Sequence, residues 1–384
     1  MWRSELTIAE GVVIPFNFEA RYNESEELEI IIHNDSERIL ISDVSFGNNQ
    51  QGKDTFYLDF QLLDSHIEAE YKENVLEGEW IRHNRENYRI PWVAYHGQSH
   101  RFSTGRTEVQ TDLTGRWEAR FEIETETEYP AIGEFVQEGN RVSGTFMTET
   151  GDYRYLEGEI QGDRFQLSTF DGAHAFLFTG EIDESDRILG KFYSGNHYET
   201  NWTAFRNEEA SLTSAYELSG IKNPGEPLQF ELPNSEGNIV TLEDSRYVDK
   251  PKLISIMGTW CPNCLDESKF ILEYLENNPE LDIEVIAIAY ERYRDKDKVL
   301  ETLSRYKEKL QIPYEILHGG YYNKEEATNT FGFLDKIISY PTLLFVDRNN
   351  RVTKVHTGYT GPATSKFVEF SKEFDEEVRN ITAP

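Results

Sequence analysis

Hydrophobic and polar positions follow two different periods along this chain of 384 residues. In the first part, short segments alternate apolar and polar residues, and turn sequences that contain a glycine next to a polar residue recur between them roughly every 8 to 12 residues. Examples of such segments are 27–32, 142–147, 153–160 and 176–182. The pattern predicts an all-β antiparallel region over residues 1–218, folded as a sandwich, a meander or a barrel. A stretch near residue 110 suits a division into two subdomains.

The second part changes to alternating strand and helix patterns. Apolar runs of strand length, such as 252–257 and 283–290, are followed by segments in which apolar residues recur every three or four positions. This predicts an α/β domain over residues 228–384, with a mixed central sheet flanked by helices. Residues 219–227 contain two prolines and a glycine in close succession, which suits a linker between the two regions.

The two cysteines of the chain lie three positions apart, in Trp260-Cys261-Pro262-Asn263-Cys264. Because there is no third cysteine, a disulfide framework and a four-thiolate zinc site are excluded. The segment lies between a predicted strand and a predicted helix, so Cys261 is expected at or just before the helix start. The free N–H groups there favour a thiolate. We expect a dithiol in which Cys261 attacks and Cys264 resolves; half a zinc site and an inert buried pair are the alternatives.

A proline precedes the last long apolar run, in Ser339-Tyr340-Pro341-Thr342. A proline at the start of a buried strand cannot donate to the sheet, and the residue before it is restricted to extended geometry. A cis Tyr340–Pro341 bond would satisfy both constraints.

These two motifs, and the order of elements between them, resemble the thioredoxin fold and, within it, the TlpA/ResA-like thiol-disulfide oxidoreductases. The resemblance covers roughly residues 221–384. It implies a dithiol exchange enzyme outside the cytoplasm, more a reductant than an oxidant, with a redox-active Cys261–Cys264 disulfide and no other cofactor. It also implies a substrate groove around the disulfide, formed by Trp260, Pro262, Tyr340 and a cis-Pro341. Protein thiols or disulfides and an upstream electron donor are the implied partners.

Glu267 is the carboxylate most suited to assist this chemistry. It lies three positions after Cys264, so the two side chains share a helix face. By resemblance it takes the place of the acid that these oxidoreductases keep beside the active site, whereas ordinary thioredoxins carry a buried Asp at the position of Ser255. The alternative is a Glu that only stabilises the first turns of the helix. Ser268-Lys269 departs from the proline usual in relatives, so the helix bend and groove could differ.

The acidic charge limits the classes of partner that the protein is expected to bind. The formal net charge is −32, and the first 220 residues hold 42 of the 70 acidic but only 18 of the 38 basic residues. Such a surface repels nucleic acid. No apolar stretch approaches about 18 residues, and the start lacks the features of a signal peptide. The resemblance nevertheless implies an export or membrane-anchor segment outside the printed sequence.

Two other functions fit parts of the sequence. The β-rich region could capture an envelope ligand, with an incidental redox domain. A thiol peroxidase is less well supported. Such an enzyme is expected to carry a single nucleophilic cysteine in a Thr-x-x-Cys motif, whereas this chain has a dithiol. No metal site is expected, since His83, His96 and His100 lack a regular ligand spacing.

Overall fold

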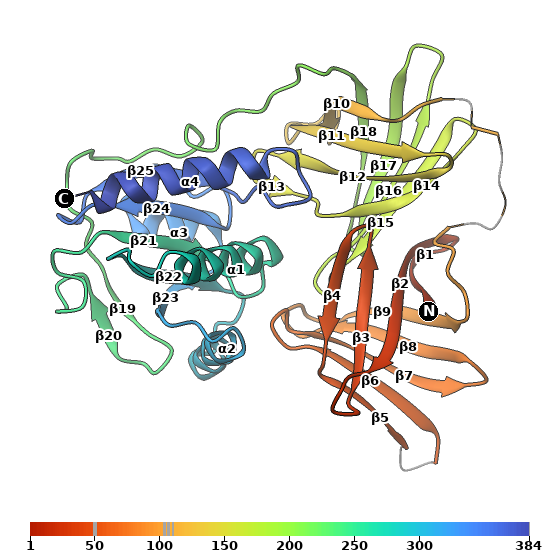
Figure 1. Ribbon diagram of the computed structural model, residues 1–384, viewed down its shortest axis with the longest axis horizontal. Coiled ribbons are helices and arrows are strands. Elements are labelled where there is room, and N and C mark those ends of the chain that lie inside the picture. The colour runs from red at the N-terminus through yellow and green to blue at the C-terminus, as the bar shows by residue number, and fades with distance from the viewer. Residues whose placement is uncertain (49–51, 103–104, 106–107, 110, 384) are drawn as a thin grey trace. The chain divides into compact units, whose positions relative to one another are not determined.

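The computed structural model describes residues 1–48, 52–102, 105, 108–109 and 111–383 (Figure 1). The chain divides into two compact units. The N-terminal unit comprises Met1–Thr148 and Tyr153–Leu212, and the C-terminal unit comprises Glu149–Asp152 and Thr213–Pro384. Residues 219–227 fall within the C-terminal unit, where Ile221 forms a β-bridge with Leu334 and Pro227 with Arg351.

The N-terminal unit begins with an antiparallel sheet whose described strands are ordered β4-β3-β2-β1-β9-β8-β7-β6-β5. Neighbours in the sheet are mostly neighbours in sequence, so short hairpins connect them. The strands are β1 (Trp2–Ala9), β2 (Val12–Tyr22), β3 (Leu28–Asn34), β4 (Glu37–Ile41), β5 (Val44–Asn48), β6 (Asp54–Phe60), β7 (Ser65–Lys72), β8 (Val75–Arg82) and β9 (Tyr88–His96).

The second sheet of this unit closes into a barrel. Within this unit its described strands run in the order β11-β10-β18-β17-β16-β15-β14-β12, and β11 also pairs with β12, which closes the ring. The strands are β10 (Gly115–Phe121), β11 (Tyr129–Glu138), β12 (Arg141–Thr148), β14 (Leu156–Gln161), β15 (Arg164–Phe170), β16 (Ala175–Ile182), β17 (Arg187–Ser194) and β18 (Tyr198–Arg206). The short strand β13 (Gly151–Asp152) falls in a segment of the C-terminal unit. The predicted all-β antiparallel fold is therefore confirmed.

Aromatic side chains fill the barrel. Trp117, Phe121, Phe146 and Trp202 are completely buried in its core. A Cβ atom at Gly190 would lie 2.5 Å from the indole ring of Trp202, so this glycine makes room for the ring. The interior is thus a packed hydrophobic core, as is usual for a barrel of this size.

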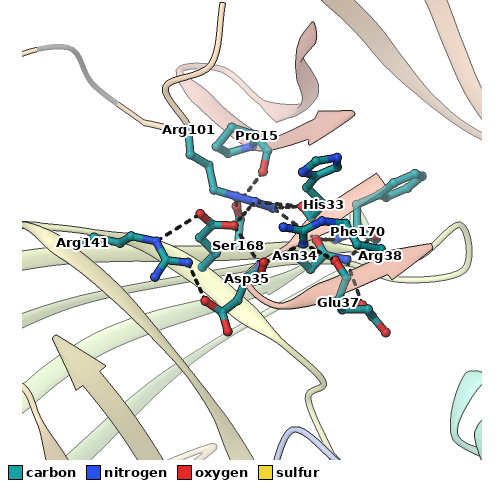
Figure 2. A network of polar contacts seen from close by, with 11 residues as sticks. Pro15, His33, Asn34, Asp35, Glu37, Arg38, Arg101, Arg141, Ser168 and Phe170 are labelled. Atoms are coloured by element: carbon teal, nitrogen blue, oxygen red, sulfur yellow. Dashed lines mark hydrogen bonds and ion pairs between the residues drawn. The ribbon is translucent and has the colours of Figure 1, made fainter. Parts of the chain in front are cut away.

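A buried arginine joins the two sheets (Figure 2). Arg101 follows the first sheet, and its guanidinium donates to the backbone oxygen of His33 and to Asn34 Oδ1, both on β3. It also donates to Ser168 Oγ on β15 of the barrel and forms an ion pair with Glu157 of β14 at 3.3 Å. One side chain therefore satisfies polar groups of both sheets.

The C-terminal unit has a five-stranded mixed sheet among the described residues, in the order β23-β22-β21-β24-β25. The first three strands in this order are parallel, and β24 and β25 are antiparallel to their neighbours. Its strands are β21 (Lys252–Met257), β22 (Glu284–Glu291), β23 (Glu315–Tyr321), β24 (Thr342–Val346) and β25 (Val352–Thr357); a separate hairpin comprises β19 (Glu231–Pro233) and β20 (Ile239–Thr241).

Four helices accompany this sheet within the described residues: α1 (Pro262–Asn277), α2 (Lys296–Lys309), α3 (Lys324–Phe331) and α4 (Phe367–Thr382). Helix α1 packs between α2 and α4. Tyr306 of α2 donates to Ser268 of α1, and Phe270 of α1 packs against Phe370 and Phe374 of α4. The predicted mixed sheet flanked by helices is confirmed, and α1 starts where β21 ends.

Candidate active site

The sulfur of Cys261 caps the N-terminus of α1. Cys261 has extended backbone angles, φ −102° and ψ 114°, and Pro262 follows at the first helical position, where a missing N–H costs nothing. The backbone N–H of Cys264 donates to Cys261 Sγ at 3.3 Å. An N–H group and the positive end of the helix dipole therefore both face the sulfur, and both favour its ionised form.

Cys264 lies one turn further along α1 and is more deeply buried. It is 1% exposed, whereas Cys261 is 7% exposed, and both are free thiols. Burial, with the hydrogen bond to Cys261, raises the pKa of Cys264 well above its usual value. The two sulfurs thus differ in their surroundings: Cys261 Sγ accepts a hydrogen bond from an N–H group at the helix end, whereas burial disfavours the ionised form of Cys264.

Glu267 is buried beneath the dithiol, with 1% of its surface exposed. Burial raises the pKa of its carboxyl to about 8, although the hydrogen bond from Ser255 opposes the shift. Ser255 Oγ donates to Glu267 Oε2 at 2.6 Å, and within the described part of the chain Oε1 has no hydrogen-bond partner. The charge of Glu267 contributes to the raised pKa of Cys264. A carboxyl group that titrates near neutral pH is suited to exchange a proton with a nearby thiol.

The proline motif lies against the outer cysteine. The Tyr340–Pro341 bond is cis. The thiol of Cys261 donates to the backbone oxygen of Tyr340 at 3.4 Å, across 79 positions of sequence. The Trp260 ring meets the Tyr340 ring edge to face, with centroids 5.8 Å apart. All seven residues singled out in the sequence therefore lie at the start of α1 or at the loop before β24.

The sequence did not single out Glu291, which also belongs to this site. Its carboxylate accepts two hydrogen bonds from Thr259, two residues before Cys261. The available signal was a carboxylate directly after the apolar residues of the β22 segment, at the end of the strand where α/β proteins place their sites. Glu291 is 1% exposed, a degree of burial that a charged residue almost never has unless it is paired.

No group of three or more His, Cys, Asp or Glu side chains among the described residues is arranged to hold a metal ion. In the same ranges, none of the helices combines the length and apolar character needed to cross a membrane.

The C-terminal unit is similar to known proteins. Residues 224–355 match the model of the AhpC/TSA family. Similar solved structures include a thiol:disulfide interchange protein of the thioredoxin family from Chlorobium tepidum, 19% identical, which covers 43% of this chain and 100% of its own, with a TM-score of 0.32. A DsbF homologue from Corynebacterium diphtheriae is 18% identical and covers 42% of this chain and 93% of its own, also with a TM-score of 0.32. The search of curated proteins found no match.

Proposed function

We propose that this protein, whose residues 224–355 match the model of the AhpC/TSA family and lie in a thioredoxin-like domain, is a thiol-disulfide oxidoreductase. The observation that carries the proposal is the position of Cys261. Its sulfur forms the N-cap of α1, next to the backbone oxygen of Tyr340 and one turn from Cys264. A peroxidase of the same family requires a single nucleophile, whereas this site offers a nucleophile with a resolving partner.

The reaction follows from the two thiols. The Cys261 thiolate attacks one sulfur of a substrate disulfide, forming a mixed disulfide and releasing the other substrate sulfur as a thiolate. Cys264 then loses its proton and attacks Cys261, which closes the Cys261–Cys264 disulfide and releases the second substrate thiol. The substrate gains two electrons and two protons, and the enzyme dithiol is oxidised. A separate electron donor must return it to the dithiol.

Glu267 is proposed as the acid-base group for the second step. Cys264 must be deprotonated before it can attack, and its raised pKa makes this unfavourable without a base. The Glu267 carboxyl, with a pKa of about 8, is ionised in part at neutral pH and can accept the proton directly or through a water. Trp260, Pro262, Tyr340 and Pro341 are proposed to form the groove for the substrate chain.

Reductase activity is the direction that we propose. A thiolate stabilised in the reduced form makes a dithiol oxidising, whereas a dithiol kept protonated is a better electron donor. The raised pKa of Cys264 supports the second situation. As the resemblance to TlpA/ResA-like proteins implies, we place the reaction outside the cytoplasm; recovery of the native protein only from the cytosol after cell fractionation would contradict this assignment.

Reduction of insulin disulfides tests the proposed function. We expect turnover by the wild type with a chemical reductant as donor, and a loss of about a hundredfold or more in both Cys261→Ser and Cys264→Ser. Only Cys264→Ser should accumulate a mixed disulfide with the substrate, because it retains the attacking sulfur but cannot release the product. Equal turnover in the wild type and both variants would refute the proposal.

A further inference from the structure

Glu291, at the end of strand β22, is hydrogen-bonded to Thr259, which lies two positions before the nucleophile Cys261. Glu291 is the last residue of β22 and is buried. Its Oε1 accepts a hydrogen bond from the backbone N–H of Thr259 at 2.9 Å, and its Oε2 accepts one from Thr259 Oγ1, also at 2.9 Å. Two bonds from one residue to both carboxylate oxygens fix the position of that residue, and hydrogen bonds of this kind favour the ionised carboxylate.

The two residues on either side of Glu291 in the sequence, Tyr290 and Arg292, contact Trp260, which follows Thr259. The indole Nε1 of Trp260 donates to the backbone oxygen of Tyr290 at 2.9 Å. The guanidinium carbon of Arg292 lies 4.1 Å from the centroid of the Trp260 ring. A Cβ atom at Gly258 would lie 2.4 Å from Trp260 Nε1, so only glycine leaves room for this arrangement. Tyr290, Glu291 and Arg292, at and just after the end of β22, therefore hold Thr259 and Trp260, the two residues that precede Cys261.

We propose that Glu291 is a positioning residue for the nucleophile and that it also keeps the dithiol reducing. Its hydrogen bonds to Thr259 hold the segment that places Cys261 Sγ at the N-cap of α1. Its negative charge is buried two residues from Cys261 along this segment, where the low dielectric weakens screening. The groups that interact electrostatically with Cys261 from other positions are Lys324 at the start of α3, which is a cation, and Cys264, Tyr306 and Tyr340, whose pKa values are raised mainly by burial. A like charge disfavours a thiolate, so Glu291 opposes the stabilisation that the helix end and Lys324 provide. This inference rests on the proposed function and assigns a residue that sets its direction.

Replacement of the charge alone tests the inference. Glu291→Gln retains the size of the side chain and can still form hydrogen bonds with Thr259. We expect the pH midpoint of Cys261 alkylation to move to lower pH, and the equilibrium with glutathione to shift at least threefold toward the dithiol, because the thiolate loses a repulsive neighbour. Glu284→Gln is the matched control, since Glu284 begins the same strand and is paired with Arg246 at the other end of the sheet. A Glu291→Gln protein that behaves like Glu284→Gln overturns the inference.

A second pair of variants tests the clamp without altering Glu291. Thr259→Val removes the hydroxyl bond to the carboxylate, and Thr259→Ser retains it. With the bond lost, the carboxylate charge is less well compensated, so the alkylation midpoint in Thr259→Val should move to higher pH, opposite to Glu291→Gln. Thr259→Ser should match the wild type. Identical midpoints in the two Thr259 variants would refute the clamp even if Glu291→Gln failed to fold.

These measurements are independent of any substrate protein. If insulin is not reduced but the alkylation midpoints shift as expected, the proposed function fails and the positioning role of Glu291 stands. If insulin is reduced but the midpoints do not move, the proposed function stands and the inference about Glu291 fails.

Discussion

Glu267 is a carboxyl group in surroundings that disfavour its charge. It is buried, and it receives a hydrogen bond only from Ser255 among the contacts of its carboxyl group described above. Its pKa rises from 4.5 to about 8 because burial removes the solvation of the carboxylate. The folded protein therefore binds this proton more tightly than the unfolded chain does. The stabilisation is complete below pH 4.5 and is lost as the pH rises through about 8.

The stability of the dithiol form should therefore depend on pH through Glu267. Between pH 5 and pH 8.5, the free energy of unfolding of the C-terminal unit should fall by an amount on the order of 4 kcal/mol owing to Glu267 alone. Glu267→Gln should remove this part of the fall, because the amide does not ionise. Denaturant unfolding followed by the helical circular dichroism signal measures it. Glu273→Gln, an exposed position on α1, is the control; an equal pH dependence in Glu267→Gln and the wild type would contradict the buried charge.

At the scale of the element, helix α4 packs against α1, the helix that carries Cys264 and begins at Cys261, and holds it in place. Phe374 is completely buried and packs against Phe270 and Tyr274 of α1 and against Phe345 of β24. These contacts join α1, which carries both cysteines, to the strand that follows the cis proline. The position of the dithiol relative to Tyr340 therefore depends on a hydrophobic layer that contains no reactive group.

Truncation of this contact should destabilise the unit. Phe374→Ala is expected to lower the free energy of unfolding by about 3 to 5 kcal/mol, since it removes a buried ring and leaves a cavity. Val368→Ala on the same helix, where the side chain is 78% exposed, should change it by less than about 0.5 kcal/mol. Denaturant titration of both variants measures the difference. Similar losses in the two would mean that α4 does not support α1 through this layer.

At the scale of the whole molecule, two units of different construction share one chain. The C-terminal unit carries the dithiol, and the N-terminal unit comprises two sheets joined by Arg101 (Figure 2). Burial lowers the pKa of the Arg101 guanidinium to about 10, so it remains charged at neutral pH. Glu157 and the oxygens around it compensate this charge. Removing the arginine would take away the buried cation beside Glu157 and a donor shared by the backbone oxygen of His33 and Asn34 Oδ1.

Arg101→Met should therefore lower the stability of the N-terminal unit by about 3 kcal/mol or more. Arg164→Met is the matched control, because its ion pair with Glu181 lies on an exposed face, and pairs of that kind contribute about 0 to 1 kcal/mol. Thermal unfolding followed by tryptophan fluorescence is suitable, since five of the six tryptophans lie in this unit. An unfolding midpoint in Arg101→Met equal to that of the control would show that the arginine does not join the sheets.

The fold and part of the site could be predicted from local sequence. Alternation with a period of two predicted the antiparallel strands, and the change to helical spacing predicted the α/β unit. Cys261 and Cys264 are three residues apart, so their placement on one helix turn needed no knowledge of distant contacts. Glu267 could be predicted for the same reason, because it lies three residues after Cys264 on the same helix. The closure of the barrel could not be predicted, because it requires β10 to pair with β18, which lies about 80 positions later in the sequence, and local alternation does not encode that pair.

The sequence alone determined the type and order of the elements and the dithiol on its strand-to-helix turn, because both depend on residues close together in the chain. Only the tertiary structure decided which groups surround the sulfur. Tyr340 lies 79 positions from Cys261, and Glu291 lies 32 positions from Thr259. Strand order brings each pair together: β21 lies between β22 and β24, so the ends of its two neighbours face the nucleophile. Sheet order and register follow from packing over the whole unit, and local periodicity does not encode them.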